Sequence, residues 1–204
     1  MASKALKANI VIHTCAVTSA VAAGAWASIP LIGAFGIIFG LDTLFLTPMT
    51  IGMVIYIGKL HGHSYKYAEL MAGVGQVIGM VLGINVARAL AALVPGWGTG
   101  LNAAIAFGLQ ETIGWGAYLL LERGGKIENL GEFIRDNEDD IKKTIKQEKA
   151  NAEKVEQAIS HLPPDKKAEY DNLKSQFERK NLSKAQKIEI QEKMIRIVEE
   201  AMLT

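Results

Sequence analysis

Charged residues are divided very unequally along this chain of 204 residues. Residues 8–121 contain six charged side chains, whereas residues 122–204 contain 35. About a quarter of the residues in an ordinary soluble domain are charged. The first part therefore has too few charges to coat a water-exposed surface, and we expect lipid or partner subunits to cover it. We predict an apolar membrane domain over residues 1–125 and a charged helical tail over residues 126–204.

The apolar part divides into four segments of helical length. They run over residues 9–29, 43–57, 67–94 and 99–121, and a glycine-rich stretch at 31–42 leads into the second. Each is near the ~20 residues that cross a ~30 Å hydrocarbon core as a helix. Pro48 makes the second segment the weakest, and Gly124-Gly125 is a stop signal after the fourth. We predict an all-α fold.

Short matches suggest that these segments form a duplicated helical hairpin. Thr50-Ile51-Gly52 and Thr112-Ile113-Gly114 repeat at an offset of 62. In each case a tyrosine, Tyr56 or Tyr118, follows four residues after the glycine. A Pro-x-x-Gly turn repeats at an offset of 65. The predicted turn residues are Pro30, Gly33, Pro95, Gly96 and Gly98. Two hairpins in tandem are the simplest organisation that accounts for both matches.

Basic residues predict how these hairpins are oriented. They precede the first segment, flank the loop between the second and third, and follow the fourth: Lys4, Lys7, Lys59, Lys66, Arg123 and Lys126. Positive charge stays on the cytoplasmic side of a membrane. We therefore expect both termini, the central loop and the tail to be cytoplasmic.

The tail has the pattern of three amphipathic helices. One row of residues follows alternating four- and three-residue steps, as in a coiled coil, with Glu148 as its misfit: Ile141, Ile145, Glu148, Ala152, Val155, Ile159 and Leu162. We call it the heptad row. Pro163-Pro164 ends this helix, a second is expected over 165–180, and Ser183 with Gln186 forms a capping box for a third. We expect the helices to bury their apolar faces on one another or on a second copy.

Small residues recur at every fourth position of two apolar segments. The predicted close-packing residues are Ala16, Ala20, Gly24 and Ser28 in the first segment and Gly75, Gly79 and Gly83 in the third. This spacing places them on one helix face, where a second backbone can approach closely. Packing within the four-helix unit and formation of a homo-oligomer both remain open.

Two charged residues lie inside apolar segments and need partners. Arg88 and Glu111 are on opposite arms of the second predicted hairpin, and Asp42 is a further candidate partner. A buried charge is costly unless it is paired. We expect a structural charge pair, with a polar pathway or a conformational switch as alternatives.

Other motifs fall short of a catalytic or binding site. His61 and His63 lack a firm third metal ligand, and His13 and Cys15 diverge on a helix. The glycine-rich Gly52–Lys59 stretch has the wrong spacing for a phosphate-binding loop. A net charge of +1 gives no case for nucleic acid. We predict no enzyme activity, no metal and no cofactor.

Residues 18–123 resemble a bacterial family, the domain of unknown function 697, as found in YcjF-like inner-membrane proteins. The resemblance rests on Ala27-Ser-Ile-Pro30, Asp42, Leu46-Thr-Pro-Met-Thr-Ile-Gly-Met53, Ala87-Arg88, Leu93-Val-Pro-Gly-Trp-Gly98, Asn102-Ala-Ala and Thr112-Ile-Gly114. It implies an all-helical, membrane-associated module that works beside a GTPase. This chain has no phosphate-binding loop of its own, so the GTPase would be a separate protein.

These features favour a non-enzymatic membrane anchor or scaffold whose tail self-associates or recruits a partner. The alternatives are a pore-forming protein that folds in water and then inserts, a small channel or transporter subunit, and a soluble oligomer that hides its apolar helices. The expected partners are the lipid bilayer, further copies of the chain and a separate GTPase or other protein.

Overall fold

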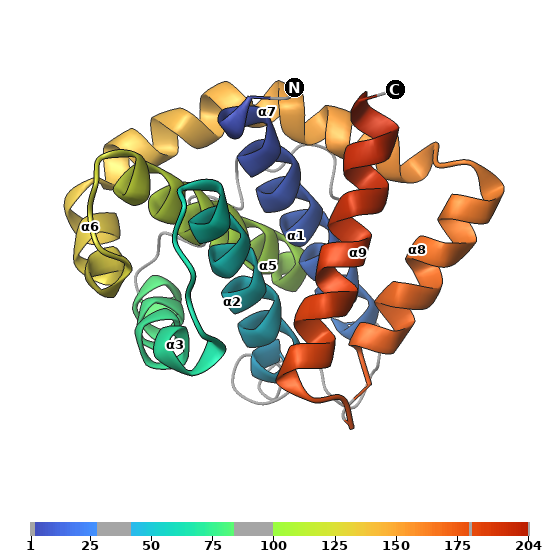
Figure 1. The fold of residues 1–204 in the computed structure, drawn as a ribbon, viewed down its shortest axis with the longest axis horizontal. Helices are drawn as coiled ribbons and strands as arrows, with labels where there is room; N and C mark the ends of the chain where they lie inside the picture. The colour runs from blue at the N-terminus through green and yellow to red at the C-terminus, as the bar shows by residue number, and fades with distance from the viewer. Residues whose placement is uncertain (1–2, 28–41, 84–99, 180, 204) are drawn as a thin grey trace.

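The computed structural model describes residues 3–27, 42–83, 100–179 and 181–203. These residues form helices and no strand, which confirms the all-α prediction. The helices are α1 (Lys4–Ala27), α2 (Asp42–Leu60), α3 (Tyr67–Gly83), α5 (Gly100–Glu122), the short η2 (Ile127–Asn129), α6 (Leu130–Asp136), α7 (Glu138–Ser160), α8 (Pro164–Phe177) and α9 (Lys184–Leu203). Figure 1 shows α1, α2 and α5 in the middle of the molecule, with α7, α8 and α9 around them.

Local sequence signals explain several helix ends. Gly124 has a φ of 73° and follows the end of α5, as expected for a glycine stop. The Ser183 hydroxyl accepts from the Gln186 N–H at 3.3 Å, and the Gln186 side chain accepts from the Ser183 N–H at 2.8 Å. This reciprocal pair confirms the predicted capping box. By contrast, α2 continues through Pro48, which was expected to weaken it.

The helices α1, α2 and α5 form the apolar centre, with α1 antiparallel to the other two. Lys4 lies 3.7 Å and His61 lies 3.0 Å from the Glu122 carboxylate. Farther along, Ser19 accepts from Gln110 at 3.1 Å. Residue numbers therefore rise along α1 as they fall along α5. We call the region of Lys4, His61 and Glu122 the charged end; α1 ends, and α2 and α5 begin, at the opposite end.

The predicted hairpins are seen in part. α1 lies antiparallel to α2, as a hairpin requires, but α1 packs most extensively against α5. α3 has few contacts with α5 and lies mainly on α2 and α6. The predicted turn residues Pro30, Gly33, Pro95, Gly96 and Gly98 lie outside the described residues. The duplicated hairpin therefore stays a prediction.

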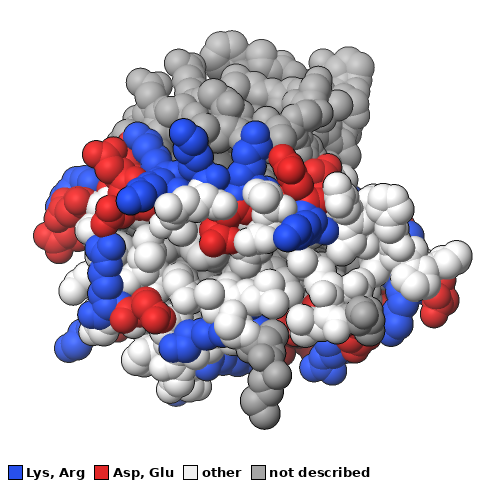
Figure 2. All heavy atoms as spheres, turned by 90° about the horizontal axis from the view of Figure 1, so that it is seen from above, with Lys and Arg blue, Asp and Glu red and all other residues white. Residues whose placement is uncertain are grey.

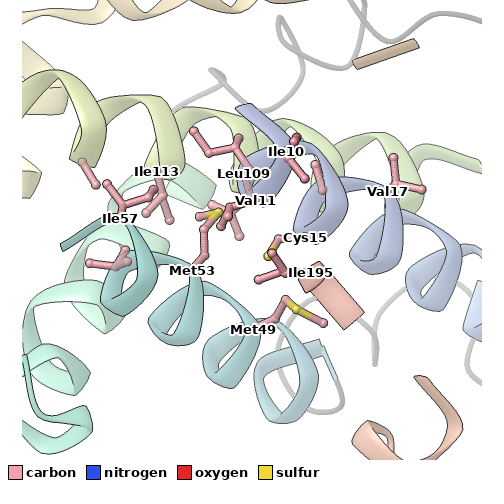
Figure 3. Close-up of a cluster of buried hydrophobic side chains, with 14 of the residues drawn as sticks. Ile10, Val11, Cys15, Val17, Met49, Met53, Ile57, Leu109, Ile113 and Ile195 are labelled. Atoms are coloured by element: carbon pink, nitrogen blue, oxygen red, sulfur yellow. The ribbon is translucent and has the colours of Figure 1, made fainter. Parts of the chain in front are cut away.

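The tail packs on the apolar centre and shares one hydrophobic cluster with it. α7 lies on α1 and α5, and α9 lies on α1 and α2. In Figure 3, Ile195 of α9 points toward Cys15 of α1 and Met49 of α2. The expectation that the tail helices bury their apolar faces on one another is confirmed in part, because α9 packs on α8 and contacts α7. The apolar face of α7 also lies on α1 and α5, which was not expected, and packing on a second copy stays a prediction.

One helix in the described ranges is long and apolar enough to cross a membrane, namely α1 over Lys4–Ala22. Length and composition alone do not separate a spanning helix from the core helix of a soluble protein. Of the apolar stretch in α1, 78% is buried inside the protein. Any membrane-spanning role of α1 therefore has to account for the helices that now cover it.

Candidate functional site

Glu111 is the centre of a buried polar cluster between α1 and α5. Its side chain is 1% exposed, and one carboxylate oxygen accepts from Nδ1 of His13, which is also 1% exposed. The other oxygen accepts from the Trp115 indole N–H at 3.0 Å. Both carboxylate oxygens are thus satisfied, and the cluster ties α1 to α5.

This arrangement gives Glu111 a partner that was not predicted, His13. The predicted pairing of Glu111 with Arg88 or Asp42 stays a prediction. Arg88 lies outside the described residues, and Asp42 begins α2 with its side chain not described. His13 was missed because its partner is 98 residues away in the sequence.

Asn9 of α1 explains the misfit of the heptad row. Its side-chain amide donates to the carboxylate of Glu148 on α7. Glu148 also accepts from the Asn151 amide at 2.7 Å. A carboxylate at this core position is therefore matched to a donor on the helix that α7 covers. The broken heptad pattern marks a specific contact with α1.

Two further polar contacts join α1 to the tail. Thr18 donates its hydroxyl proton to the Thr14 carbonyl at 2.6 Å, so the Tyr170 hydroxyl of α8 is the donor to Thr18 at 2.8 Å. Gln191 of α9 donates to Cys15 Sγ at 3.1 Å and to the Met49 carbonyl at 2.9 Å. We call Asn9–Glu148, Thr18–Tyr170 and Cys15–Gln191 the three polar contacts. The helices α7, α8 and α9 thus supply one contact each.

Charged residues link the tail to the rim of this interface. Lys59 of α2 pairs with Glu192 of α9, and the Tyr56 hydroxyl donates to Glu199 at 2.9 Å. Arg123 donates to Asp140 of α7 at 2.8 Å. Such pairs contribute little each when exposed. We expect these pairs to set the orientation of α7 and α9 and to add little to the stability of the fold.

The loop histidines have structural partners. His61 contacts the Ile57 carbonyl and Glu122, each at 3.0 Å, and its hydrogen bond lowers the pKa of the Glu122 carboxyl. His63 stacks on Tyr65. Within the described ranges, no group of three or more potential ligand residues is placed to hold a metal ion.

Close helix approaches occur at the glycines of the repeated triplets. A Cβ on Gly52 would lie 2.0 Å from Gln191 Oε1, and one on Gly114 would lie 2.7 Å from Ile12. Ala16 and Ala20 are fully buried, as expected for packing positions. A Cβ on Gly75, in contrast, meets nothing within 4 Å, so Gly75 makes no close helix contact in the described part of the chain.

The remaining predicted packing residues are not tested by these contacts. Gly24 is in α1, and Gly79 and Gly83 are in α3, but their surroundings are not described. Ser28 lies outside the described residues. The close-packing role of the glycine row in α3 stays a prediction.

A cavity of about 340 Å³ separates α3 from the segment that follows α5. Its lining includes Gly73, Val77, Glu128, Glu132 and Arg135. Arg135 lies 3.7 Å from Glu132 and 3.0 Å from Asp136. Arg135 is thus paired with Glu132 of the lining and with Asp136, and the described lining has no arrangement of nucleophile and base.

The chain matches no protein-family model, no curated protein and no solved structure. The resemblance to the domain of unknown function 697 therefore rests on the residues quoted above. The class defined by the structure is an all-α protein in which charged helices cover apolar ones.

Proposed function

We propose that this protein is a non-enzymatic, membrane-associated helical protein. Its apolar segments attach the chain to a bilayer, and the charged tail forms the side that faces water. In a bacterial cell this side would be the cytoplasm and the bilayer the inner membrane. A GTPase working beside it, as the family resemblance implies, would bind from the same side.

The observation that carries this proposal is the separation of the two ends of the apolar helices. Lys4, His61 and Glu122 meet at the charged end. At the opposite end α2 begins with Asp42, and the helices lead into residues 28–41, which have no charged residue, and residues 84–99, which have one, Arg88. A bilayer would accept these apolar segments, whereas the charged end requires water.

The surface of the tail supports the same orientation. Figure 2 shows charged side chains of both signs over the face that is seen from above. Lys143, Lys146 and Lys149 are exposed on α7, while its apolar face is buried. Partner recruitment by the tail would therefore use its charged outer surface and not the heptad row.

Flotation with neutral phosphatidylcholine vesicles tests the proposal. We expect the purified full chain to float with the vesicles and to remain bound in high salt, because attachment is apolar. Ile37→Asp places a charge in the uncharged 28–41 segment and is expected to reduce flotation at least about tenfold, since an Asp in hydrocarbon costs about 3 kcal/mol.

Leu203→Asp is the matched control, because Leu203 is an exposed apolar residue of α9 at 52% exposure. It is expected to leave flotation unchanged. Failure of the full chain to float, or equal losses from the two substitutions, would remove the case for attachment through the apolar segments.

A further inference from the structure

We infer that α1 is a latent membrane-spanning helix that the C-terminal tail masks, so that the tail has to lift from α1 before this helix enters a bilayer. The inference rests on the proposed membrane association and adds the step that limits it. It assigns the tail a second role, as a cover that competes with lipid for the same helix face.

α1 combines the composition of a membrane-spanning helix with a buried position. Lys4–Ala22 has the length and composition of a spanning helix, yet 78% of its apolar stretch is buried. α5 contributes most of that burial and α2 comes next, while the tail helices α7 and α9 cover a smaller part of α1. Lipid chains and the apolar faces of the tail helices offer α1 equivalent surroundings. Exchange of one for the other therefore loses little burial of α1.

The tail is held on α1 by apolar contacts within the shared hydrophobic cluster and by polar contacts that water can replace. Glu148, Tyr170 and Gln191 each hydrogen-bond a residue of α1, and a bond of this kind adds about 0.5–1.5 kcal/mol net. Asn9 Oδ1 and Gln191 Oε1 are buried with no partner among the described residues. Lifting the tail would hydrate its polar groups, which lowers the cost of release.

Some polar residues of α1 have partners within α1 and α5, whereas His13 Nε2 and Thr14 Oγ1 are buried with no partner among the described residues. Thr18 donates to the Thr14 carbonyl of its own helix. His13 pairs with Glu111, and Glu111 also accepts from Trp115. A paired carboxylate is far less costly in a bilayer than an isolated one. The inserting unit is therefore α1 together with α2 and α5, which pack on it, and the His13–Glu111–Trp115 cluster inside this unit stays intact.

A reversible cross-link between α2 and α9 tests the order of events. Lys59 and Glu192 form an ion pair at the exposed rim and take no part in the three polar contacts. In the variant Lys59→Cys, Glu192→Cys, Cys15→Ala, a bis-methanethiosulfonate reagent would join the two helices by disulfides. A reducing agent would release them. Circular dichroism checks that the variant folds as the parent chain does.

Two readouts on the same vesicles separate the inference from the proposed function. Flotation at neutral pH reports attachment and is expected to be equal for locked and reduced protein. Resistance to alkaline carbonate extraction reports insertion. We expect it to be at least about tenfold lower in the locked form and to recover on reduction. Equal carbonate resistance of locked and reduced protein, with flotation intact, would overturn the inference alone. No flotation of either form would overturn the proposed function and the inference with it.

A second pair of variants separates tail release from general instability. Gln191→Ala removes one of the three polar contacts, while Ile134→Ala makes a cavity in α6 next to Gly116 of α5. The two chains are compared under conditions that give them the same free energy of unfolding. The Gln191→Ala chain is then expected to insert faster than the Ile134→Ala chain. Equal insertion rates would show that the tail contacts do not limit insertion.

Discussion

At the scale of single residues, the buried polar groups fix which helices meet. Glu111 is 1% exposed and has both oxygens bonded, so its charge is kept inside by His13 and Trp115. Removing one member of a buried pair leaves the other uncompensated, which costs more than the pair itself contributes.

Substitutions of Glu111 are expected to separate charge from shape. Glu111→Ala leaves the N–H groups of His13 and Trp115 without their acceptor and should lower the free energy of unfolding by about 3–5 kcal/mol. Glu111→Gln keeps an acceptor oxygen and should cost less. Urea unfolding followed by tryptophan fluorescence measures both, with the exposed Glu153→Ala as control. Equal losses for the Ala and Gln variants would argue against hydrogen bonding to Trp115 and His13 as the cause.

Two glycines are expected to respond in opposite ways to alanine. A Cβ on Gly52 would meet Gln191 Oε1 at 2.0 Å, whereas one on Gly75 meets nothing within 4 Å. Gly52→Ala should therefore destabilise by about 1–3 kcal/mol through crowding. Gly75→Ala should stabilise α3 by about 0.5–1 kcal/mol. Thermal unfolding checks the signs; a stabilising Gly52→Ala would contradict the contact with Gln191.

At the scale of elements, the sequence predicts helices well and their partners poorly. Periodicity and the capping box of Ser183 and Gln186 identify α7 and α9 because these signals are local. The partner of a helix face is set by residues far along the chain. Glu148 is the exception: a carboxylate in a heptad row predicts a polar partner, although it does not name Asn9. The turns of the hairpins stay untested, since they lie outside the described residues.

The face of α9 that covers the apolar centre also has a recognisable sequence pattern, because it includes polar residues. Lys187 and Gln191 are both buried and lie between two apolar rows of α9, one of Ile188, Ile195, Val198 and Met202 and the other of Ile190, Met194, Ile197 and Ala201. Lys187 lies over the Phe177 ring at 5.2 Å. Burial lowers the pKa of the Lys187 ammonium. Polar residues between two apolar rows thus indicate contacts with other helices.

Replacing Lys187 by methionine is expected to stabilise the protein at pH 7. The folded pKa of Lys187 lies below the unfolded one, so the unfolded chain binds more protons between them and stability rises with pH. Lys187→Met removes the cost of burying the charge. Its advantage in urea midpoint should shrink as pH rises through the folded pKa of the lysine.

Lys193→Met is the control for this prediction, since Lys193 is exposed on the same helix and pairs with Glu189. It is expected to give no gain at pH 7. A Lys187→Met chain that is less stable than the parent at pH 7 would mean that the contact with Phe177 outweighs the cost of burial.

At the scale of the whole molecule, the division seen in the sequence does not become two separate packing units. The apolar helices and the tail share one hydrophobic cluster in the described part of the chain. Six charges in residues 8–121 implied that something must cover the apolar part. Part of that cover is the tail of the same chain. The unequal distribution of charge thus reflects an inner and an outer layer of helices.

Thiol labelling of Cys15 tests this cover most directly. Cys15 is the single cysteine, is fully buried, and lies beneath Gln191 of α9. In the folded full chain, without vesicles, a water-soluble maleimide is expected to label it at least about 100-fold more slowly than in urea-unfolded protein. Gln191→Ala should raise the folded rate. Labelling of the folded chain as fast as the unfolded chain would contradict the claim that the tail covers α1.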